Sequence, residues 1–304
     1  MRKPNVADSQ FMRWRVGAVR ITRVCEIGGA PFPSTFLFRD ASPELVQRHA
    51  WLRPHFAHED GRLYGSIHSF VIESGKRRII VDTCVGNDKP RTTKAWNLLQ
   101  GPFLENLRQA GYAADTIDTV LCTHLHVDHV GWNTRLEKGK WVPTFRHASY
   151  LFGRKEWEHW SSEEADHHSG DVMGDSVRPI IDAGLAQLVE MDHQLTDEVR
   201  LEPTPGHTPG HVSVHISSRG EDAVITGDIM HHPLQCAEPD LANSFDADAD
   251  AARHTRREFL GRYANRPILI LGTHFAPPTG GWIVNEDQAW RLALAPPTGK
   301  RGAE

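Results

Sequence analysis

The amino-acid sequence predicts an α+β protein in which two β-sheets pack face to face between two layers of helices, a four-layer αββα sandwich. Short β-branched and apolar runs, typical of strands, occur in both halves of the 304-residue chain. Each half also contains a run with helical character that follows strands. A chain of this length can bury a sizeable core, and its 39% hydrophobic and 24% charged residues are typical of a globular protein.

The first half contains four predicted strands and one predicted helix. Residues 16–24 are β-branched and alternate in polarity, which favours a strand. Residues 66–73 and 77–82 flank a glycine-containing turn and are predicted to form a hairpin. Apolar residues at helical spacing and a final glycine predict a helix over residues 103–111, and residues 119–122 form a short apolar strand.

The second half contains more predicted strands and one further predicted helix. Residues 249–263 have helical composition and lead into a buried apolar run. The predicted strands of this half cover residues 148–152, 186–191, 199–202, 211–216 and 223–226, and the buried run covers residues 267–271. Strand clusters in both halves, each followed by a helix, therefore predict the two-sheet sandwich.

We expect the chain to form a single domain over residues 1–304. Residues 26–64 are rich in proline and predict an irregular N-terminal excursion, which could act as a lid or as a contact in a homodimer. The polar stretch 156–175 is rich in Trp, His and acidic residues and is the predicted substrate-facing segment. Residues 295–304 are predicted to form a frayed tail.

Composition excludes several classes of partner and location. The formal net charge is −5 and the Lys and Arg residues are scattered, so we expect no nucleic-acid partner. The mean hydropathy is negative and no run approaches the length of a membrane-spanning helix, so we expect no membrane partner. Residues 1–14 lack the apolar core of a secretory signal, which predicts a cytoplasmic protein. The four cysteines form no C-x-x-C pair and predict neither disulfides nor a thiolate zinc site.

One segment concentrates metal-binding side chains. Residues 123–129 read T-H-L-H-V-D-H and place four such groups within six residues, directly after a predicted strand. Imidazole and carboxylate groups suit zinc, and also manganese, iron or cobalt. Alternate residues of an extended loop point the same way, so His124 and His126 can share one ion. Asp128 and His129 can then serve a second ion.

This H-x-H-x-D-H pattern resembles the signature of the metallo-β-lactamase superfamily. Three downstream segments match its other metal motifs in order: T-P-G-H-T-P-G-H at residues 204–211, I-T-G-D at 225–228 and L-G-T-H-F at 271–275. The resemblance implies the αββα sandwich of that superfamily and a set of seven ligands. It assigns His124, His126 and His207 to a first metal, Asp128, His129 and His274 to a second, and Asp228 to a bridge between them.

The resemblance implies a hydrolase with two divalent metal ions, for which zinc is the best candidate. Two cations that share a carboxylate lie about 3.5–4 Å apart and hold a hydroxide near neutral pH. That bridging hydroxide is expected to attack a C=O or P=O electrophile. Asp82, at the end of a predicted strand, resembles the family aspartate that accepts the free N–H of a ligand histidine.

Asp128, Asp228 and His231 are the residues that we expect to act in catalysis. His231 stands three residues after Asp228, where the homoserine lactonase branch has a tyrosine that hydrogen-bonds the substrate. His231 is therefore predicted to face the substrate rather than the metals. Five aromatic residues near the motifs are candidates to line the pocket: Trp132, Trp157, Trp160, Phe275 and Trp282. The remaining histidines are predicted to be surface or core residues: His147, His159, His167, His168, His193, His211, His215 and His254.

Within the superfamily, the chain is similar to the homoserine lactonase and methyl parathion hydrolase branch, which also carries an N-terminal excursion before the metal motif. The predicted substrate is a small hydrophobic lactone, carboxylic ester or organophosphate triester. The alternatives are a mononuclear iron oxidoreductase similar to a persulfide dioxygenase, and a β-lactamase or thioesterase of the same fold. A non-enzymatic scaffold is disfavoured, because all seven expected ligands are present.

Overall fold

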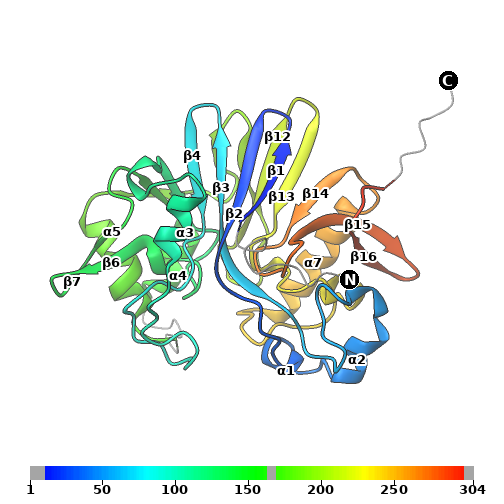
Figure 1. Ribbon diagram of the computed structural model, residues 1–304. Coiled ribbons are helices and arrows are strands. Elements are labelled where there is room, and N and C mark those ends of the chain that lie inside the picture. The colour runs from blue at the N-terminus through cyan, green and yellow to red at the C-terminus, as the bar shows by residue number, and fades with distance from the viewer. Residues whose placement is uncertain (1–10, 163–168, 298–304) are drawn as a thin grey trace.

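Two mixed β-sheets form the centre of the molecule, and helices cover their outer faces (Figure 1). This computed structural model describes residues 11–162 and 169–297. The four-layer αββα sandwich predicted from the sequence is confirmed. His167, His168 and most of the predicted tail lie outside the described residues. None of the helices within the described ranges combines the length and the apolar character needed to cross a membrane.

The first sheet has the strand order β1-β2-β3-β4-β5-β8-β9. Its strands are β1 (Phe11–Val16), β2 (Val19–Gly28), β3 (Ser66–Ser74), β4 (Arg77–Val81), β5 (Thr119–Leu121), β8 (Ser149–Gly153) and β9 (Ala186–Val189). The predicted hairpin is present as the antiparallel pair β3 and β4. The strand predicted over 16–24 is present as β2, but β2 begins at Val19, because Gly17 adopts a φ of +56° and turns the chain between β1 and β2.

The second sheet has the order β10-β11-β12-β13-β14-β15-β16. Its strands are β10 (Gln194–Thr196), β11 (Val199–Pro203), β12 (Val212–Ser218), β13 (Glu221–Ile225), β14 (Ile268–Leu271), β15 (Gly280–Glu286) and β16 (Ala289–Ala293). The hairpin of β15 and β16 was not predicted, and neither was the small hairpin of β6 (Thr134–Glu137) and β7 (Lys140–Pro143).

Two predicted helices are confirmed as α3 (Phe103–Gln109) and α7 (Ala249–Tyr263). Asp248 caps α7 by accepting the N–H groups of Asp250 and Ala251. The other α-helices are α1 (Ser34–Leu37), α2 (Pro43–Arg48), α4 (Arg154–Trp160), α5 (Arg178–Asp182) and α6 (Leu234–Ala237). Short 3-10 segments cover Ala50–Leu52, Ala114–Thr116, Gly131–Asn133 and Gly227–Ile229, and a π-helical turn covers Met173–Val177.

Apolar burial holds the layers together. The facing sides of the two sheets bury β-branched and leucine side chains, among them Val16, Ile72, Val81, Leu121, Val214 and Ile225. A second cluster lies under α3 and α5 on the first sheet, and a third lies under α6, α7 and the N-terminal excursion on the second. Since strands at the centre of such a sandwich bury both faces, the short, continuously apolar runs of the sequence follow from the fold.

The topology gathers several strand ends at one edge of the sandwich. β4 is parallel to β5, β5 is parallel to β8, and β13 is parallel to β14. Parallel strands end at the same edge of a sheet, and ligands bind there in open α/β sheets. All the loops that carry the predicted metal ligands begin at this edge.

Candidate metal centre

Four strand ends supply the predicted ligands. The chain leaves β5 at Leu121 and reaches His124 three residues later, and it leaves β11 at Pro203 and reaches His207. Asp228 follows β13 by three residues, and His274 follows β14 by three residues. A side chain that follows the end of a strand by only a few residues is held in place by the sheet, yet its backbone is free to turn the side chain toward the cavity. This explains why each candidate ligand lies so close to a strand end.

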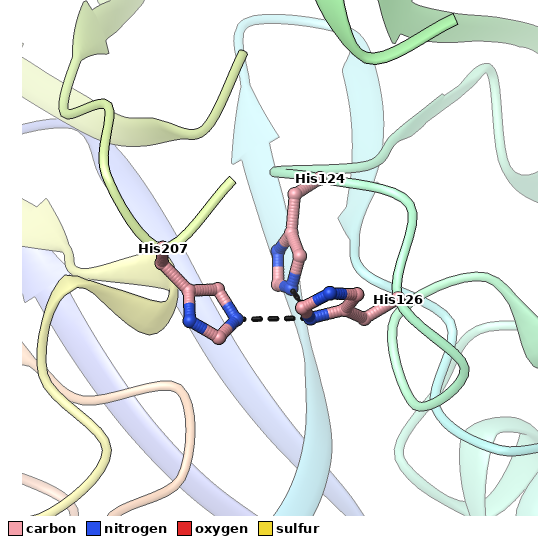
Figure 2. A group of neighbouring side chains, drawn as sticks. All are labelled: His124, His126 and His207. Carbon is pink, nitrogen blue, oxygen red and sulfur yellow. Dashed lines mark hydrogen bonds between the residues drawn. The ribbon is translucent and has the colours of Figure 1, made fainter. Parts of the chain in front are cut away.

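The first ligand group is formed by His124, His126 and His207. His126 Nδ1 lies 3.0 Å from His124 Nε2 and 2.9 Å from His207 Nε2, so three ring nitrogens converge on one point (Figure 2). Burial lowers the pKa of all three imidazoles well below the usual value. Neutral rings keep a lone pair, which is the form that binds a metal.

The second group is formed by Asp128, His129 and His274. His274 Nε2 lies 3.3 Å from His129 Nε2 and 3.6 Å from Asp128 Oδ2. Asp128 Oδ1 is also 3.6 Å from His129 Nε2. This group therefore contains one carboxylate more than the first group, which draws on imidazoles alone.

Asp228 lies between the two groups. Its Oδ2 is 3.5 Å from His207 Nε2 in the first group and 3.3 Å from His129 Nε2 in the second. The carboxylate is almost fully buried; His274 Nε2 lies 3.2 Å from its Oδ1, but no described residue donates a well-aligned hydrogen bond to that oxygen. A buried carboxylate oxygen without a donor is costly unless a cation compensates it, so the position suits an atom that bridges two metal ions.

The charges within the site also fit metal ions. Burial disfavours a charged ring at His129 and at His274, yet the facing carboxylates, Asp228 above all, raise the pKa of both imidazoles. The carboxylates thus require positive charge at the place where the second group converges. Divalent cations would supply that charge, and a nitrogen and oxygen ligand set suits zinc and its neighbours rather than thiolate-preferring metals.

Outer contacts orient the ligand rings. His274 Nδ1 donates to the Ser66 carbonyl at 3.1 Å, which leaves Nε2 for the centre. Asp82 Oδ2 lies 3.0 Å from His129 Nδ1, as expected from the sequence, although the N–H bond approaches the oxygen obliquely. Asp82 also accepts the backbone N–H of Thr123 at 2.8 Å, so it holds the start of the motif loop.

His211 holds the backbone of Asp228, a role that differs from the surface or core role predicted for it. Its Nδ1 donates to the Thr204 carbonyl at 2.9 Å, and its Nε2 accepts the Asp228 N–H at 2.7 Å. Burial lowers the pKa of this imidazole to about 4, which preserves the neutral acceptor. Gly227 has a φ of +56°, and a Cβ there would lie 2.4 Å from His211 Nε2. In the sequence, the repeated Gly-His of residues 206–211 (G-H-T-P-G-H) was the pattern that could have drawn attention to His211.

Glu156 is a second residue that sequence reasoning missed. This fully buried carboxylate accepts the backbone N–H of Leu125 at 3.1 Å and that of Gly210 at 2.7 Å. Glu156 therefore joins the loop of His126 to the loop of His207. It begins the polar stretch that was predicted to face the substrate, and the described part of that stretch contributes only Ser169 to the cavity.

A cavity of about 590 Å³ opens over the ligand groups. His126, Asp128, His207, Asp228 and His274 form its floor. The apolar residues that form its walls include Ile27, Phe32, Phe36, Leu37, Ile67, Trp96, Val127 and Phe245. Among the described residues around it there is no Lys or Arg. A neutral, apolar ligand therefore suits this cavity.

The predicted excursion supplies much of this wall, but the predicted aromatic lining is wrong. None of the five aromatic candidates is among the described residues that line the cavity. Trp132 stacks on Phe103 and donates to Glu26, so it belongs to the core under the first sheet. Trp160 contacts the His126 ring but donates its N–H to Glu156. Nearness to the motifs in sequence did not place these side chains on the cavity side of the loops.

His231 lies both in the cavity wall and against the ligand groups. Its Nε2 is 3.0 Å from Asp228 Oδ2, and its ring is nearly parallel to that of His274, with centroids 5.7 Å apart. His231 Nδ1 is buried and has no hydrogen-bond partner among residues 11–162 and 169–297. The structure brings His231 to the cavity, as predicted, and also to within ligand distance of His207 and Asp228.

Residues 63–275 match the metallo-beta-lactamase superfamily. This segment covers more than two thirds of the chain and contains every ligand of both groups. The protein belongs to the metallo-β-lactamase superfamily.

Similar proteins include hydrolases and lactonases. An N-acyl homoserine lactonase from Bacillus sp. is 25% identical over 154 residues, which are 46% of this chain and 53% of that relative. The alignment thus spans about half the length of the curated relative. The structure of hydrolase AbOPH of the β-lactamase superfamily aligns with a TM-score of 0.78 at 22% identity, over 94% of this chain and 98% of that one. AidC, a dizinc quorum-quenching lactonase, aligns with a TM-score of 0.76 at 20% identity, over 95% and 97% of the two chains. The predicted resemblance to this branch is confirmed at the level of the fold.

Proposed function

We propose that the protein is a dinuclear metal-dependent hydrolase of neutral, hydrophobic lactones, carboxylic esters or organophosphate triesters. One observation carries this proposal. Two ligand groups meet at a buried carboxylate, Asp228, on the floor of a cavity with apolar walls. The metal groups supply the chemistry, and the walls select the substrate.

His124, His126 and His207 would hold one ion, Asp128, His129 and His274 would hold the other, and Asp228 would serve both. Two divalent cations held in this way, most favourably Zn²⁺, lower the pKa of water toward neutrality and polarise a C=O or P=O group. The chain contributes the geometry: buried neutral imidazoles, carboxylates that face the centre, and backbone contacts that keep the loops in place.

His231 has a separate role in this proposal. It lies on the cavity side of Asp228, where a substrate carbonyl or phosphoryl oxygen would be placed. A neutral imidazole N–H at that position can donate to the oxygen as negative charge builds on it. Since the cavity offers no Lys or Arg among its described residues, His231 is the side chain best placed to act as this donor.

The cavity supports a substrate with an apolar body. Its wall combines aromatic and aliphatic side chains from residues 27–37 with Trp96 and Phe245. Apart from the proposed metal ions, the described wall offers no Lys or Arg that could bind an anionic group of a substrate. The lactonase and hydrolase names of the similar proteins agree with a neutral ester-like substrate.

A substrate panel tests the proposal. Protein of known metal content is assayed on acyl lactones, aryl esters, phosphotriesters, β-lactams and thioesters, and the ratios of kcat/KM identify the class. We expect the first three groups to exceed the last two. Preference for a β-lactam or thioester, or a single bound iron with persulfide oxidation, would contradict the proposed function.

A further inference from the structure

A second buried carboxylate stands behind the first ligand group, outside every metal motif of the sequence. Asp246 Oδ1 lies 2.9 Å from His207 Nδ1, on the side of the ring opposite to the convergent Nε2. The side chain of Asp246 has no exposed area. Asp246 lies in the loop between α6 and α7, and thus 39 residues after the histidine that it contacts.

The loop of Asp246 is fixed to the loop of His207 by the backbone as well. The N–H of Ala247 donates to the His207 carbonyl at 2.9 Å, and the N–H of Asp248 donates to the Gly206 carbonyl at 3.0 Å. Asp246 Oδ2 accepts the N–H of Asn243 at 2.9 Å, which closes its own loop. Both carboxylate oxygens therefore have assigned partners, and the carboxylate cannot rotate without breaking one of them.

A buried arginine of α7 compensates the charge of Asp246. Arg256 is fully buried, and its Nη2 lies 3.8 Å from Asp246 Oδ2. Arg256 Nε donates to the Ile229 carbonyl at 2.8 Å, one residue after Asp228, and Nη1 donates to the Pro239 carbonyl at 2.7 Å. Arg256 thus connects the segment of the bridging aspartate to the loop that carries Asp246. A buried carboxylate without such a cation would be costly.

The hydrogen bond from His207 to Asp246 determines which ring nitrogen carries the proton. With Nδ1–H directed at a carboxylate, the lone pair lies on Nε2, which faces His126 and Asp228. A carboxylate behind a ligand histidine also raises the basicity of the ring toward a metal. The corresponding contact of the second group, between Asp82 and His129, is less well aligned.

We propose that Asp246, held by Arg256, is a positioning residue that fixes the tautomer of His207 and increases the affinity of His207 for the first metal ion. This inference rests on the proposed function only in requiring that a divalent metal ion binds at His207. It assigns the loop between α6 and α7 a part in metal binding, although no ligand lies in that loop under the superfamily assignment.

The test measures metal affinity in Asp246→Ala, Asp246→Asn and wild-type protein. Zn²⁺-loaded protein competes with a chromophoric chelator, so the affinity of each ion is read without any assay of hydrolysis. We expect Asp246→Ala to bind one of the two ions about 10–100-fold more weakly, the range typical of lost outer partners, and to keep the other unchanged. Asp246→Asn keeps an acceptor without the charge and should show a smaller loss in the same ion.

Asp248→Ala is the matched control. Asp248 lies two residues away in the same loop and caps α7, but its side chain does not contact His207. We expect this variant to lose stability and to retain both metal affinities. An equal loss of metal in Asp248→Ala and Asp246→Ala would show a general effect of the loop and would overturn the proposal.

A second readout works in the metal-free protein. Nitrogen-15 NMR of the imidazoles should show His207 as the Nδ1–H tautomer in wild type, and a mixture of tautomers in Asp246→Ala. Wild-type affinities for both ions in Asp246→Ala, or an unchanged tautomer, would overturn the assignment. The proposed function would instead be contradicted if the wild-type protein bound two ions but hydrolysed nothing on the substrate panel. The comparison of metal affinities between wild type and Asp246→Ala would still test the role of Asp246.

Discussion

The floor and the wall of the cavity are built by different means. The floor consists of ligands a few residues beyond strand ends, each loop held by buried polar contacts such as those of His211 and Glu156. The wall consists mainly of apolar side chains from the N-terminal excursion and from the loops of Trp96 and Phe245, with Ile67 of β3 and Val127 of the motif loop. Phe36 and Phe245 of this wall remain 41% and 47% exposed.

Because of this difference, we expect the floor to determine the reaction and the wall to determine which substrates are accepted. A displaced ligand would break several buried hydrogen bonds at once, so the floor tolerates little change. A changed wall residue alters only apolar contact area, which affects the fold little and the ligand directly. We therefore expect substitutions in the floor to abolish reaction or metal binding, and substitutions in the wall to redistribute substrate preference.

The largest effect is expected for Asp228→Ala. This change removes the carboxylate that faces both ligand groups and leaves His129 and His274 without their main counter-charge. Hydrolysis of the best substrate should fall to near background and the metal content should drop, as measured by kinetics and elemental analysis. A fully active variant with two bound metals would show that Asp228 is not the shared ligand.

His231→Ala should reduce kcat by about 10²–10³ and keep both metals, because it removes one donor to the developing negative charge. His231→Phe should behave in the same way, since it restores an aromatic ring but no N–H. The structure sharpens this test, because His231 also lies within ligand distance of His207 and Asp228. Loss of a metal ion in either variant would make His231 a ligand instead of a substrate contact.

His232 connects the floor of the cavity to the N-terminal excursion, and we expect its protonation to lower the free energy of unfolding. Its Nε2–H donates to the Phe56 carbonyl at 2.9 Å, and its Nδ1 accepts the N–H of Leu234 at 3.0 Å. Burial lowers the pKa of His232 to about 4, below the 6.5 expected in the unfolded chain. The contribution of neutral His232 is therefore complete above pH 6.5 and is lost as the pH falls toward 4.

Between pH 7 and pH 4, this linkage should reduce the free energy of unfolding by about 3 kcal/mol, since each pKa unit corresponds to about 1.4 kcal/mol. His232→Gln keeps polar atoms at the site but cannot titrate, so its stability should fall less over the same range. Denaturant unfolding at matched metal content measures the difference. Parallel pH profiles for the two proteins would contradict a buried, neutral His232.

The smallest effect is expected in the wall. Phe36 and Phe245 are in ring contact with centroids 5.7 Å apart, and both line the cavity. Phe36→Ala or Phe245→Ala should raise KM about tenfold for substrates with a long apolar chain, the effect of losing about 1.4 kcal/mol of apolar contact. Short-chain analogues should change little, and Leu136→Ala, an exposed residue outside the cavity lining, should have no effect.

The same contrast explains what could be predicted from the sequence. The candidate ligands of the floor lie in short motifs whose spacing follows from strand ends, so a cluster that contains His124, His207 and Asp228 could be predicted from the sequence. The main sheets and α7 were predictable because apolar periodicity reports burial directly. The β15 and β16 hairpin was missed because β15 begins with two glycines after a proline-containing turn, so that only W-I-V marks it as a strand.

Contacts that depend on tertiary structure could not be found in this way. Asp246 and Glu156 meet their partners over 39 and 54 residues of sequence, and nothing local to either residue marks the contact. The aromatic wall was misassigned for the same reason. Trp132 is close to the motif in sequence but packs in the core, whereas Phe245 is remote from it and lines the cavity.

The most direct test of the dinuclear account is a titration of metal-free protein with Zn²⁺, followed by hydrolysis of the best substrate of the panel. Activity should reach its plateau only when the second equivalent per chain is bound. His207→Ala and His274→Ala should each bind a single equivalent, and anomalous-scattering maps should place it in a different ligand group in each variant. Full activity at one equivalent, or loss of the same ion in both variants, would contradict the central claim.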